Sequence, residues 1–500
     1  MKPSEAFAKY CHAFASQDGA AIEHLFGEAS EFSIPLLREP VTGRANIRAQ
    51  LLRSAIGQKE IEVQILRAID LDSIGYVEAT YRAVVVGTGG KLDGSPHRMD
   101  FRFMARIVME QGKIKSLEEF LDTRPLFPDE RQKMFAVNRL TPYFEKTVEE
   151  GCLEWMVYNN MHFPLVYDHL PYEAYDALAK GVTLWDVGLE RQTQVKGPDA
   201  RRFVDYLSCR DMSRMKTGDC RYTILTDENG LIMSDPVALF IDDDTIWLSH
   251  GNVDLTLWAR GIVMNSEWRV TVCEPDVAPV QIQGPLSVPL LDEVCKEPPS
   301  ALKYYKCMRT SVDGMPVVVS RTGWSSGEGF EIYPLSSDYC IPIWDKLKRH
   351  GEKYGLRVTA PNLHRAIERG VTDINYYNNS GMNPLEDLSS KLVDLDGEAE
   401  FIGKAALREI RARGVSRRSV GLLFDEEVPR LEWFWKLQDS RGGGGEVRWA
   451  VHSFALNQSI GIAVVDKAVE LGEVVRVTHP RGTVRGRVTD VPFVSKSAIG

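Results

Sequence analysis

The chain has 500 residues, of which 44% are hydrophobic and 26% are charged, a composition typical of a soluble globular protein. The formal net charge of −10 argues against nucleic acid as the main partner, because binding to phosphates needs a basic surface. No apolar run is long enough to span a membrane, and the N-terminus lacks the apolar core of a signal peptide. We therefore expect a cytoplasmic protein of roughly three domains.

Residues 1–125 are predicted to form one small α+β unit. Apolar residues within 7–14 have helical spacing and predict an amphipathic first helix. Alternation with period two predicts strands around 61–65, 77–85 and 101–105, and a turn at Gly112 leads to a further short strand. Helices followed by a long curved antiparallel sheet describe a cone. This order resembles the NTF2-like (SnoaL-like) superfamily.

The resemblance leaves two roles open for this first unit. Domains of that superfamily often enclose an apolar cone and often dimerise, so we expect assembly into a homo-oligomer or shielding of a substrate. A second ligand-binding or catalytic pocket is the alternative. No Tyr/Asp pair has a spacing that favours it. Its polar candidates are Tyr10, His12, Tyr81, His97 and Glu119.

The rest of the chain reads as a linker and two further domains. Residues 124–140 contain two prolines and many charges, and we place the linker at 126–140. Residues 141–416 alternate short strands, turns and helices without a βαβ rhythm. Residues 417–500 are rich in strands and predict a small β-barrel, with a hairpin loop at the RGGGG segment 441–445.

Common catalytic and metal-binding signatures are missing from the sequence. The eight cysteines include no CxxC pair and the ten histidines are dispersed, so we predict no metal site and reduced cysteines that pack in the core. The chain has no GxGxxG in a nucleotide-binding context, no GxxxxGK[ST], no GxSxG and no HExxH.

Four ordered segments carry the functional signal. They are YNNM (158–161) with WDVGLERQTQVKGPDA (185–200), RYTILTDENGLIMSDPVAL (221–239), RTGWSSGEGFEIY (321–333) and NLHRAIERG (362–370). Together they resemble the aminomethyltransferase family, which comprises the T-protein of the glycine cleavage system and its folate-dependent relatives. The resemblance covers roughly 141–496 and implies a T-protein-type folate-binding α+β fold with the C-terminal barrel. Within the family, the WDVG and KGPDA segments look most like the branch that demethylates dimethylsulfoniopropionate.

The resemblance implies tetrahydrofolate as cofactor, with its pterin on Glu331, the last Glu of GWSSGEGFE. A carboxylate accepts two parallel hydrogen bonds from the 2-amino and ring NH groups of a pterin. A surface Glu at a strand edge is the alternative. Trp324 stands where the family has a Tyr, which keeps an aromatic contact and loses a hydroxyl.

The resemblance also implies that Asp235 is the catalytic residue. It lies thirteen residues after Tyr222, which we expect on the cofactor side, and Ser234 replaces one acid of the family's pair. Asp235 would attract a cationic methyl donor and orient N5 of the folate. Capping of a turn before Pro236 is the alternative.

The remaining candidates surround these two carboxylates. Arg365 matches a family arginine near the folate tail, or it is a helix-surface residue that pairs with Glu368. Tyr333 shares a strand face with Glu331, and we expect it to line the same cavity and to act in catalysis. Trp155, Tyr158 and Met161 are candidates for the substrate side, with a core role as the alternative.

The predicted reaction moves a methyl group from a small sulfonium, such as dimethylsulfoniopropionate, to N5 of tetrahydrofolate. The sulfonium departs as a neutral thioether, so proximity, alignment and desolvation suffice, and aromatic side chains can hold the cation. Three alternatives stay open. They are O-demethylation of methoxylated aromatic acids, which needs a proton donor, aminomethyl transfer of the glycine-cleavage type, and folate binding without catalysis.

Overall fold

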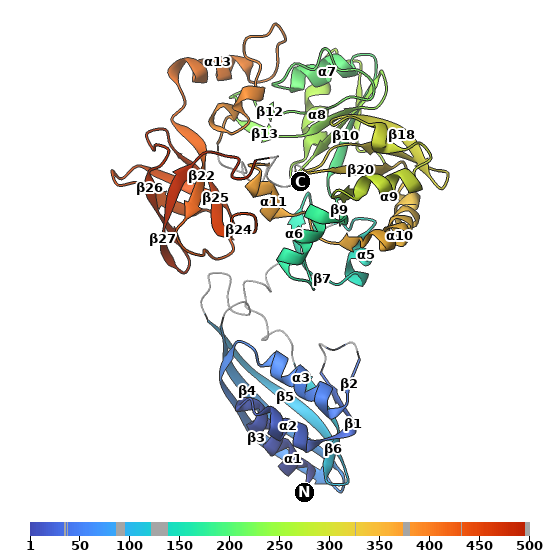
Figure 1. Ribbon diagram of the computed structural model, residues 1–500, viewed down its shortest axis with the longest axis vertical. Helices are drawn as coiled ribbons and strands as arrows, with labels where there is room; N and C mark the ends of the chain where they lie inside the picture. The colour runs from blue at the N-terminus through green and yellow to red at the C-terminus, as the bar shows by residue number, and fades with distance from the viewer. Residues whose placement is uncertain are drawn as a thin grey trace. The chain divides into compact units, whose positions relative to one another are not determined.

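The computed structural model describes residues 1–34, 37, 39–86, 96–121, 139–325, 327–373, 381–431 and 433–495. The chain divides into two compact units, Met1–Val137 and Asn138–Gly500 (Figure 1). Most of the linker predicted at 126–140 lies outside the described residues. The boundaries predicted at 125, 141 and 417 stay predictions. No helix in the described ranges combines the length and the apolar character that a membrane crossing requires.

The N-terminal unit packs helices on one face of a long mixed sheet (Figure 1). The strand order is β2-β1-β6-β5-β4-β3, and β1 and β6 run parallel while the other neighbours are antiparallel. The helices are α1 (Pro3–Ala15), α2 (Gly19–Leu25) and α3 (Arg44–Ser54). The strands are β1 (Phe26–Ser33), β2 (Val41–Thr42), β3 (Gln58–Leu71), β4 (Ile74–Val85), β5 (His97–Glu110) and β6 (Lys113–Leu121).

The predicted periodicities account for the core of this unit. Phe7, Tyr10 and Cys11 of α1 are buried, as their helical spacing predicts. On β4, burial alternates from Val77 to Val85, as a strand with one face on the core requires. The cone-shaped α+β arrangement inferred from the sequence is confirmed.

The second unit contains two larger sheets. One has the order β18-β19-β20-β17-β9-β21 and the other β11-β14-β15-β10-β16. The strands of the first are β9 (Thr183–Asp186), β17 (Val280–Gln283), β18 (Cys307–Val312), β19 (Met315–Ser320), β20 (Gly329–Pro334) and β21 (Arg357–Val358). Those of the second are β10 (Arg191–Lys196), β11 (Cys220–Tyr222), β14 (Val237–Phe240), β15 (Thr245–His250) and β16 (Thr271–Cys273).

Two short hairpins and several helices complete the body of this unit. The hairpins are β7 (Cys152–Tyr158) with β8 (Met161–Tyr167), and β12 (Leu225–Thr226) with β13 (Ile232–Ser234). The helices are α5 (Phe144–Glu149), α6 (Pro171–Lys180), α7 (Ala200–Leu207), α8 (Leu255–Val263), α9 (Ser287–Val294), α10 (Cys340–Gly351), α11 (Leu363–Glu368) and α13 (Lys404–Arg413). Short 3-10 turns are η3 (Pro299–Ala301), η4 (Ser337–Tyr339), η5 (Glu352–Tyr354), η6 (Pro384–Glu386) and η7 (Ser390–Leu392).

The small C-terminal β-barrel predicted from the sequence is confirmed. It closes in the order β22-β25-β24-β23-β26-β27, around a core of Val, Leu, Phe and Trp side chains. Its strands are β22 (Arg417–Phe424), β23 (Trp435–Gln438), β24 (Gly444–Ser453), β25 (Gln458–Asp466), β26 (Val474–His479) and β27 (Gly482–Thr489). All eight cysteines of the chain are free, and all except Cys273 are buried.

Gly284 fixes a close crossing at the end of β17 and provides a stability test. Its φ is +114°, and an added Cβ would lie 2.4 Å from the carbonyl oxygen of Gly181. Gly314 has a φ of +80° with open space around it, so it is the matched control for backbone strain alone. We expect Gly314→Ala to lower the unfolding free energy by about 1 kcal/mol. Gly284→Ala should lower it by roughly 3 kcal/mol, because collision adds to strain.

Urea unfolding followed by tryptophan fluorescence measures both variants, since all ten tryptophans lie in the second unit. Equal losses in the two variants would contradict the close crossing at Gly284.

Candidate functional site

A cavity of about 1020 Å³ lies in the second unit, at the upper end of the range of small-molecule sites. Both larger sheets, the β7–β8 hairpin, residues 360–364 and 370–373, and barrel strand β24 contribute to its wall. Carboxyl groups line the cavity at Glu190, Asp235, Glu331 and Asp373. The cavity brings together side chains that are far apart in the sequence.

Glu331 stands in the middle of the first sheet, on β20, with Gln281 of β17 and Ser320 of β19 as its register partners. Its Oε2 accepts hydrogen bonds from Thr322 Oγ1 at 2.6 Å and Tyr333 Oη at 2.7 Å, and a longer one from Ser320 Oγ at 3.4 Å. Oε1 receives no hydrogen bond from the part of the chain that the structure describes. The side chain is therefore fixed through one oxygen while the other is open to a ligand.

Tyr333 contacts the cavity residue Glu331 through its hydroxyl group. Its side chain has no exposed surface and does not line the cavity, in contrast to the expectation from the shared strand face. Strand alternation does place it beside Glu331, and burial together with the Glu331 charge raises the pKa of its phenol. A phenol held neutral in this way is a constant hydrogen-bond donor to Glu331.

Asp235 lies between β13 and β14 and lines the same cavity as Tyr222. The Tyr222 hydroxyl donates to Asp235 Oδ2 at 3.2 Å. Burial, and then the nearby charge of Asp373, raise the pKa of Asp235 well above its ordinary value, and the hydrogen bond from Tyr222 opposes the rise. The ionised form of Asp235 is therefore destabilised, and a ligand that brings positive charge close to this carboxyl would stabilise it.

Glu190 is a further carboxyl of this cavity that the sequence reasoning did not single out. It lies directly before β10, within the quoted segment WDVGLERQ. Burial and repulsion from Glu331 and Asp373 raise its pKa well above the ordinary value. No side chain in the described ranges forms a hydrogen bond or an ion pair with this carboxyl.

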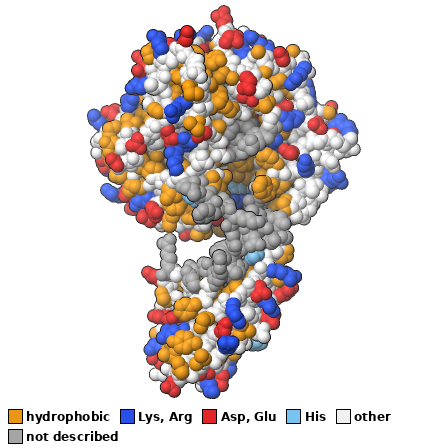
Figure 2. Space-filling model, turned by 180° about the vertical axis from the view of Figure 1, so that it is seen from behind, with side chains coloured by type: hydrophobic (Ala, Val, Ile, Leu, Met, Phe, Trp, Pro, Cys, Tyr) orange, Lys and Arg blue, Asp and Glu red, His pale blue; other side chains and the backbone are white. Residues whose placement is uncertain are grey.

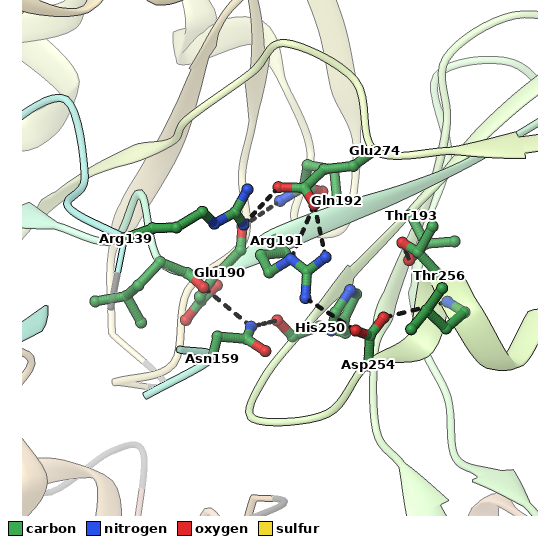
Figure 3. Close-up of polar contacts among 12 residues, drawn as sticks. Arg139, Asn159, Glu190, Arg191, Gln192, Thr193, His250, Asp254, Thr256 and Glu274 are labelled. Atoms are coloured by element: carbon green, nitrogen blue, oxygen red, sulfur yellow. Dashed lines mark hydrogen bonds and ion pairs between the residues drawn. The ribbon is translucent and has the colours of Figure 1, made fainter. Parts of the chain in front are cut away.

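The neighbouring arginine does not neutralise Glu190. Figure 3 shows the guanidinium of Arg191 turned toward Glu274 and Asp254, away from the carboxyl of Glu190. Arg191 Nη2 lies 2.6 Å from Glu274 Oε2, and Arg139 Nη2 lies 2.8 Å from the other oxygen of Glu274. Both arginines thus pair with one carboxylate, and no cation of the described residues pairs with Glu190 in the cavity.

His250 and Gln281 add polar groups to the wall. His250 Nδ1 lies 3.0 Å from the Gly251 carbonyl, to which it can only donate, and burial lowers the pKa of the ring to about 4. The ring is therefore neutral at pH 7. His250 Nε2 and Gln281 Nε2 are buried without a partner among the described residues.

The structure places the other predicted residues in different positions. Trp324 and Tyr158 line the cavity, and Trp324 Nε1 has no partner within the described ranges. Trp155 packs on Phe144 with ring centroids 5.4 Å apart, and Met161 packs against Tyr158; neither lines the cavity. The structure thus places these two side chains in contact with neighbouring aromatic residues and outside the cavity lining, and their role in binding stays a prediction.

Arg365 is not the helix-surface residue of the alternative interpretation. It is 5% exposed on α11, and its guanidinium lies over the ring of Tyr175 at 6.0 Å. Glu368 bonds instead to the hydroxyls of Tyr175 and Ser453, at 2.7 and 2.6 Å. Arg365 Nε and Nη1 have no partner in the described chain, although the residue stands one position beyond the cavity-lining His364.

The side chains that line the cavity suit an organic ligand. Within the described ranges, no three His, Cys, Asp or Glu side chains lie close enough to hold a metal ion. The cavity also carries Lys391, Arg430 and Arg448, which can face the anionic groups of a ligand. A large ligand with separate cationic and anionic parts fits this distribution of charge.

Comparisons with known proteins agree with the family resemblances inferred from the sequence for both units. Residues 144–386 match the GCVT N-terminal domain family, and residues 7–117 match the SnoaL-like domain family. A dimethylsulfoniopropionate demethylase of Ruegeria pomeroyi is 32% identical over 330 residues, which is 66% of this chain and 90% of that protein. An aminomethyltransferase of Bacillus mycoides is 29% identical over 343 residues, covering 65% and 90%.

The solved structure of glycine cleavage system aminomethyltransferase T from Bartonella henselae is similar in fold. It aligns with a TM-score of 0.64 at 20% identity, over 71% of this chain and 98% of that one. The similarity supports the T-protein-type fold inferred from the sequence.

The unpaired carboxyl of Glu190 predicts a stability effect that depends on pH. Its pKa is raised in the folded state, so the folded protein loses stability relative to the unfolded chain as pH rises above about 4.3, the ordinary Glu value. We expect Glu190→Gln to stabilise the protein at pH 8 by on the order of 1 kcal/mol. This gain should disappear below the ordinary pKa, where both states are protonated.

Glu274→Gln is the opposite control, because its partners Arg191 and Arg139 lower the pKa of Glu274 and the substitution removes their ion pairs. It should destabilise the protein at pH 8. Thermal unfolding at pH 4 and pH 8 measures both variants, and a destabilised Glu190→Gln at pH 8 would contradict the unpaired state.

Proposed function

The chain belongs to the aminomethyltransferase family, and we propose that it transfers a methyl group from a small sulfonium, such as dimethylsulfoniopropionate, to N5 of tetrahydrofolate. The demethylase and the aminomethyltransferase reported above are each matched over 90% of their length. The observation that carries the proposal is the pair of carboxyls in one cavity: Glu331 is held by hydroxyl groups, and Asp235 is partly buried with a raised pKa.

On the folate side, Glu331 is the proposed anchor of the pterin. Its open Oε1 and its fixed Oε2 accept the 2-amino and ring NH donors, in the charge-assisted geometry that suits a carboxylate. The Nε2 of Gln281, its neighbour on β17, is a donor without a partner in the described chain and suits the pterin carbonyl. Trp324 and Tyr222 supply aromatic surface for the ring.

Arg365 is proposed as a positioning residue for the anionic tail of folate. Two of its buried guanidinium nitrogens have no acceptor among the described residues, and a buried charge without hydrogen bonds is costly. The carboxylates of the tail would supply such acceptors. When bound, tetrahydrofolate would supply N5 as the nucleophile that accepts the methyl group. The sulfonium donor would then leave as a neutral thioether.

On the donor side, Asp235 and Glu190 provide carboxyls that no cation of the described residues pairs with, and Tyr158 provides a ring for a cation–π contact. Asp235 Oδ2, held by the Tyr222 hydroxyl, is the proposed acceptor of the proton that N5 loses on methylation. A raised pKa suits a carboxylate for this step. Tyr333 is proposed to position Glu331 instead of donating a proton.

This charge distribution favours a sulfonium over the methoxylated aromatic acids considered above. A methoxylated aromatic acid brings no positive charge to acids that already repel one another. The sulfonium centre of dimethylsulfoniopropionate would relieve this repulsion, with its carboxylate directed away from Glu190 and Asp235.

Product formation tests the reaction. With tetrahydrofolate and dimethylsulfoniopropionate, we expect 5-methyltetrahydrofolate by mass spectrometry. Glu331→Gln should weaken folate binding about tenfold or more, because it replaces a charged acceptor. Asp235→Asn should lower kcat by roughly a hundredfold or more with less effect on folate affinity.

Glu328→Gln is the matched control, since Glu328 lies in the same segment and pairs with Arg321 on a more exposed surface. Turnover in Glu331→Gln equal to that of Glu328→Gln would overturn the pterin assignment. Absence of product with sulfonium donors, together with product from vanillate, would favour O-demethylation.

We further propose that the N-terminal unit assembles the chain into a homo-oligomer through the outer face of its sheet. Figure 2 shows hydrophobic side chains gathered on this unit, and the exposed ones include Met104, Phe120, Tyr76 and Ile69. Met104 and Phe120 are direct cross-strand partners, as are Ile69 and Tyr76. Such an exposed apolar patch is typical of an interaction surface.

Solution mass tests this assembly. We expect at least twice the chain mass of 56.3 kDa for the wild type by light scattering, and the mass of one chain for Met104→Lys with Phe120→Lys. The double variant should keep the folate affinity of the wild type. A wild-type mass of one chain would contradict the proposal.

A further inference from the structure

Three polar side chains stand next to one another at one end of the second larger sheet. Asp235 lies two residues before β14, His250 is the last residue of β15, and Glu190 directly precedes β10. Strand β15 pairs with β14 on one side and with β10 on the other, where His250 is opposite Arg191. His250 therefore lies between the two acids at this end of the sheet, and all three residues line the same cavity.

Hydrogen bonds hold both the backbone and the ring of His250. The Nδ2 of Asn159 donates to the carbonyls of His250 at 3.2 Å and of Leu189 at 3.0 Å. This amide ties the end of β15 to the segment of Glu190 (Figure 3). His250 Nδ1 donates to the carbonyl of Gly251 at 3.0 Å, so the neutral ring carries its proton on Nδ1 and a lone pair on Nε2.

The lone pair on Nε2 is a buried acceptor without a donor. His250 is 2% exposed, and its Nε2 has no partner among the described residues. Burial lowers the pKa of the ring to about 4, so at neutral pH Nε2 accepts a hydrogen bond and does not donate one. A buried acceptor that stays unpaired costs free energy, so we expect its donor on the ligand of the cavity.

Of the two substrates in the proposed reaction, tetrahydrofolate is the one that carries N–H donors. A sulfonium such as dimethylsulfoniopropionate has no N–H or O–H group at neutral pH, and its carboxylate only accepts. The 2-amino group and the adjacent ring NH are assigned above to Glu331, and N5 to Asp235. Because His250 is the neighbour of Asp235 along the sheet, the reduced ring of the pterin is the part of the folate expected beside it.

We propose that His250 determines specificity for reduced folate, with its Nε2 accepting a hydrogen bond from an N–H of the reduced ring. This inference rests on the proposed function, because it places tetrahydrofolate in this cavity. Oxidised folic acid has no hydrogen on N5 or N8 and presents lone pairs there. The oxidised ring would therefore lose the hydrogen bond and set one lone pair against another.

The neighbouring acids are less suited to this discrimination. Burial and nearby carboxylates raise the pKa values of Asp235 and Glu190, so each can hold a proton. A protonated carboxyl donates to an oxidised ring as readily as an ionised one accepts from a reduced ring. His250 Nε2 has no such freedom near neutral pH, because the pKa of its ring is about 4.

Calorimetry of the full chain at pH 7 under argon tests this role, with tetrahydrofolate and folic acid as the two ligands. We expect the wild type to bind tetrahydrofolate about tenfold or more tightly than folic acid. His250→Leu removes the lone pair and should bring the two Kd values to within about threefold of each other. His250→Gln should also lose the preference, because its amide can turn an NH2 group toward the oxidised ring.

His364→Leu is the matched control. His364 also lines the cavity, and its Nδ1 donates to the carbonyl of His452 at 2.8 Å, but it belongs to α11 and not to this sheet. The substitution should leave the ratio of the two Kd values unchanged.

The ratio separates specificity from a structural role of His250, which would weaken the binding of both folates alike. An unchanged ratio in His250→Leu would overturn the inference, and so would equal binding of the two folates by the wild type. Either result would leave the proposed function standing, because tetrahydrofolate still binds. Absence of binding by both folates would contradict the proposed function and this inference with it.

Discussion

A carboxyl group removed from water must be paired, hydrogen-bonded or protonated, and this constraint organises the cavity of the second unit. The chain resolves it in two ways. Glu331 accepts hydrogen bonds from hydroxyl groups of β19, of the loop that follows it and of β20 itself, and holds a fixed orientation. Asp235 and Glu190 have no cationic partner among the described residues, and burial together with neighbouring carboxylates raises their pKa values. The wall of one cavity therefore contains a carboxylate in a fixed orientation, Glu331, and two acids that attract positive charge, Asp235 and Glu190.

The position of Glu331 follows from the register of the first sheet. Antiparallel pairing sets it opposite Gln281 on one side and Ser320 on the other, and alternation puts Tyr333 on the same face. Because side chains repeat with a period of two, a slip of one residue in either pairing would move Glu331 to the opposite face. The hydroxyl groups around Glu331 therefore depend on the register of the sheet, which sets Ser320 and Tyr333, and on the loop after β19, which supplies Thr322.

The sequence predicts those parts that local pattern or contiguous motifs determine. Helical spacing around Tyr10 and alternation along 77–85 predict elements of the first unit, and the motif GWSSGEGFE leads to Glu331. The sequence does not reveal that Glu190 and Asp373 approach Asp235, because that proximity arises from contacts between distant segments. The sequence also does not show that Tyr158 lines the cavity while Trp155 and Met161 do not, since the packing of the β7–β8 hairpin decides which side chains face it.

Each unit places a tyrosine hydroxyl beside a carboxyl that has no cationic partner among the described residues. In the second unit the Tyr222 hydroxyl donates to Asp235, and in the first Tyr10 lowers the pKa of Glu119 against the rise that burial causes. One hydrogen bond orients a carboxyl without neutralising it, because a phenol carries no charge near pH 7. In the second unit, further acids and a folate-sized cavity surround the pair, which suits transfer chemistry. In the first, the Cys11 thiol and the aromatic rings of the core lie around Glu119, and no further acid does so within the described residues.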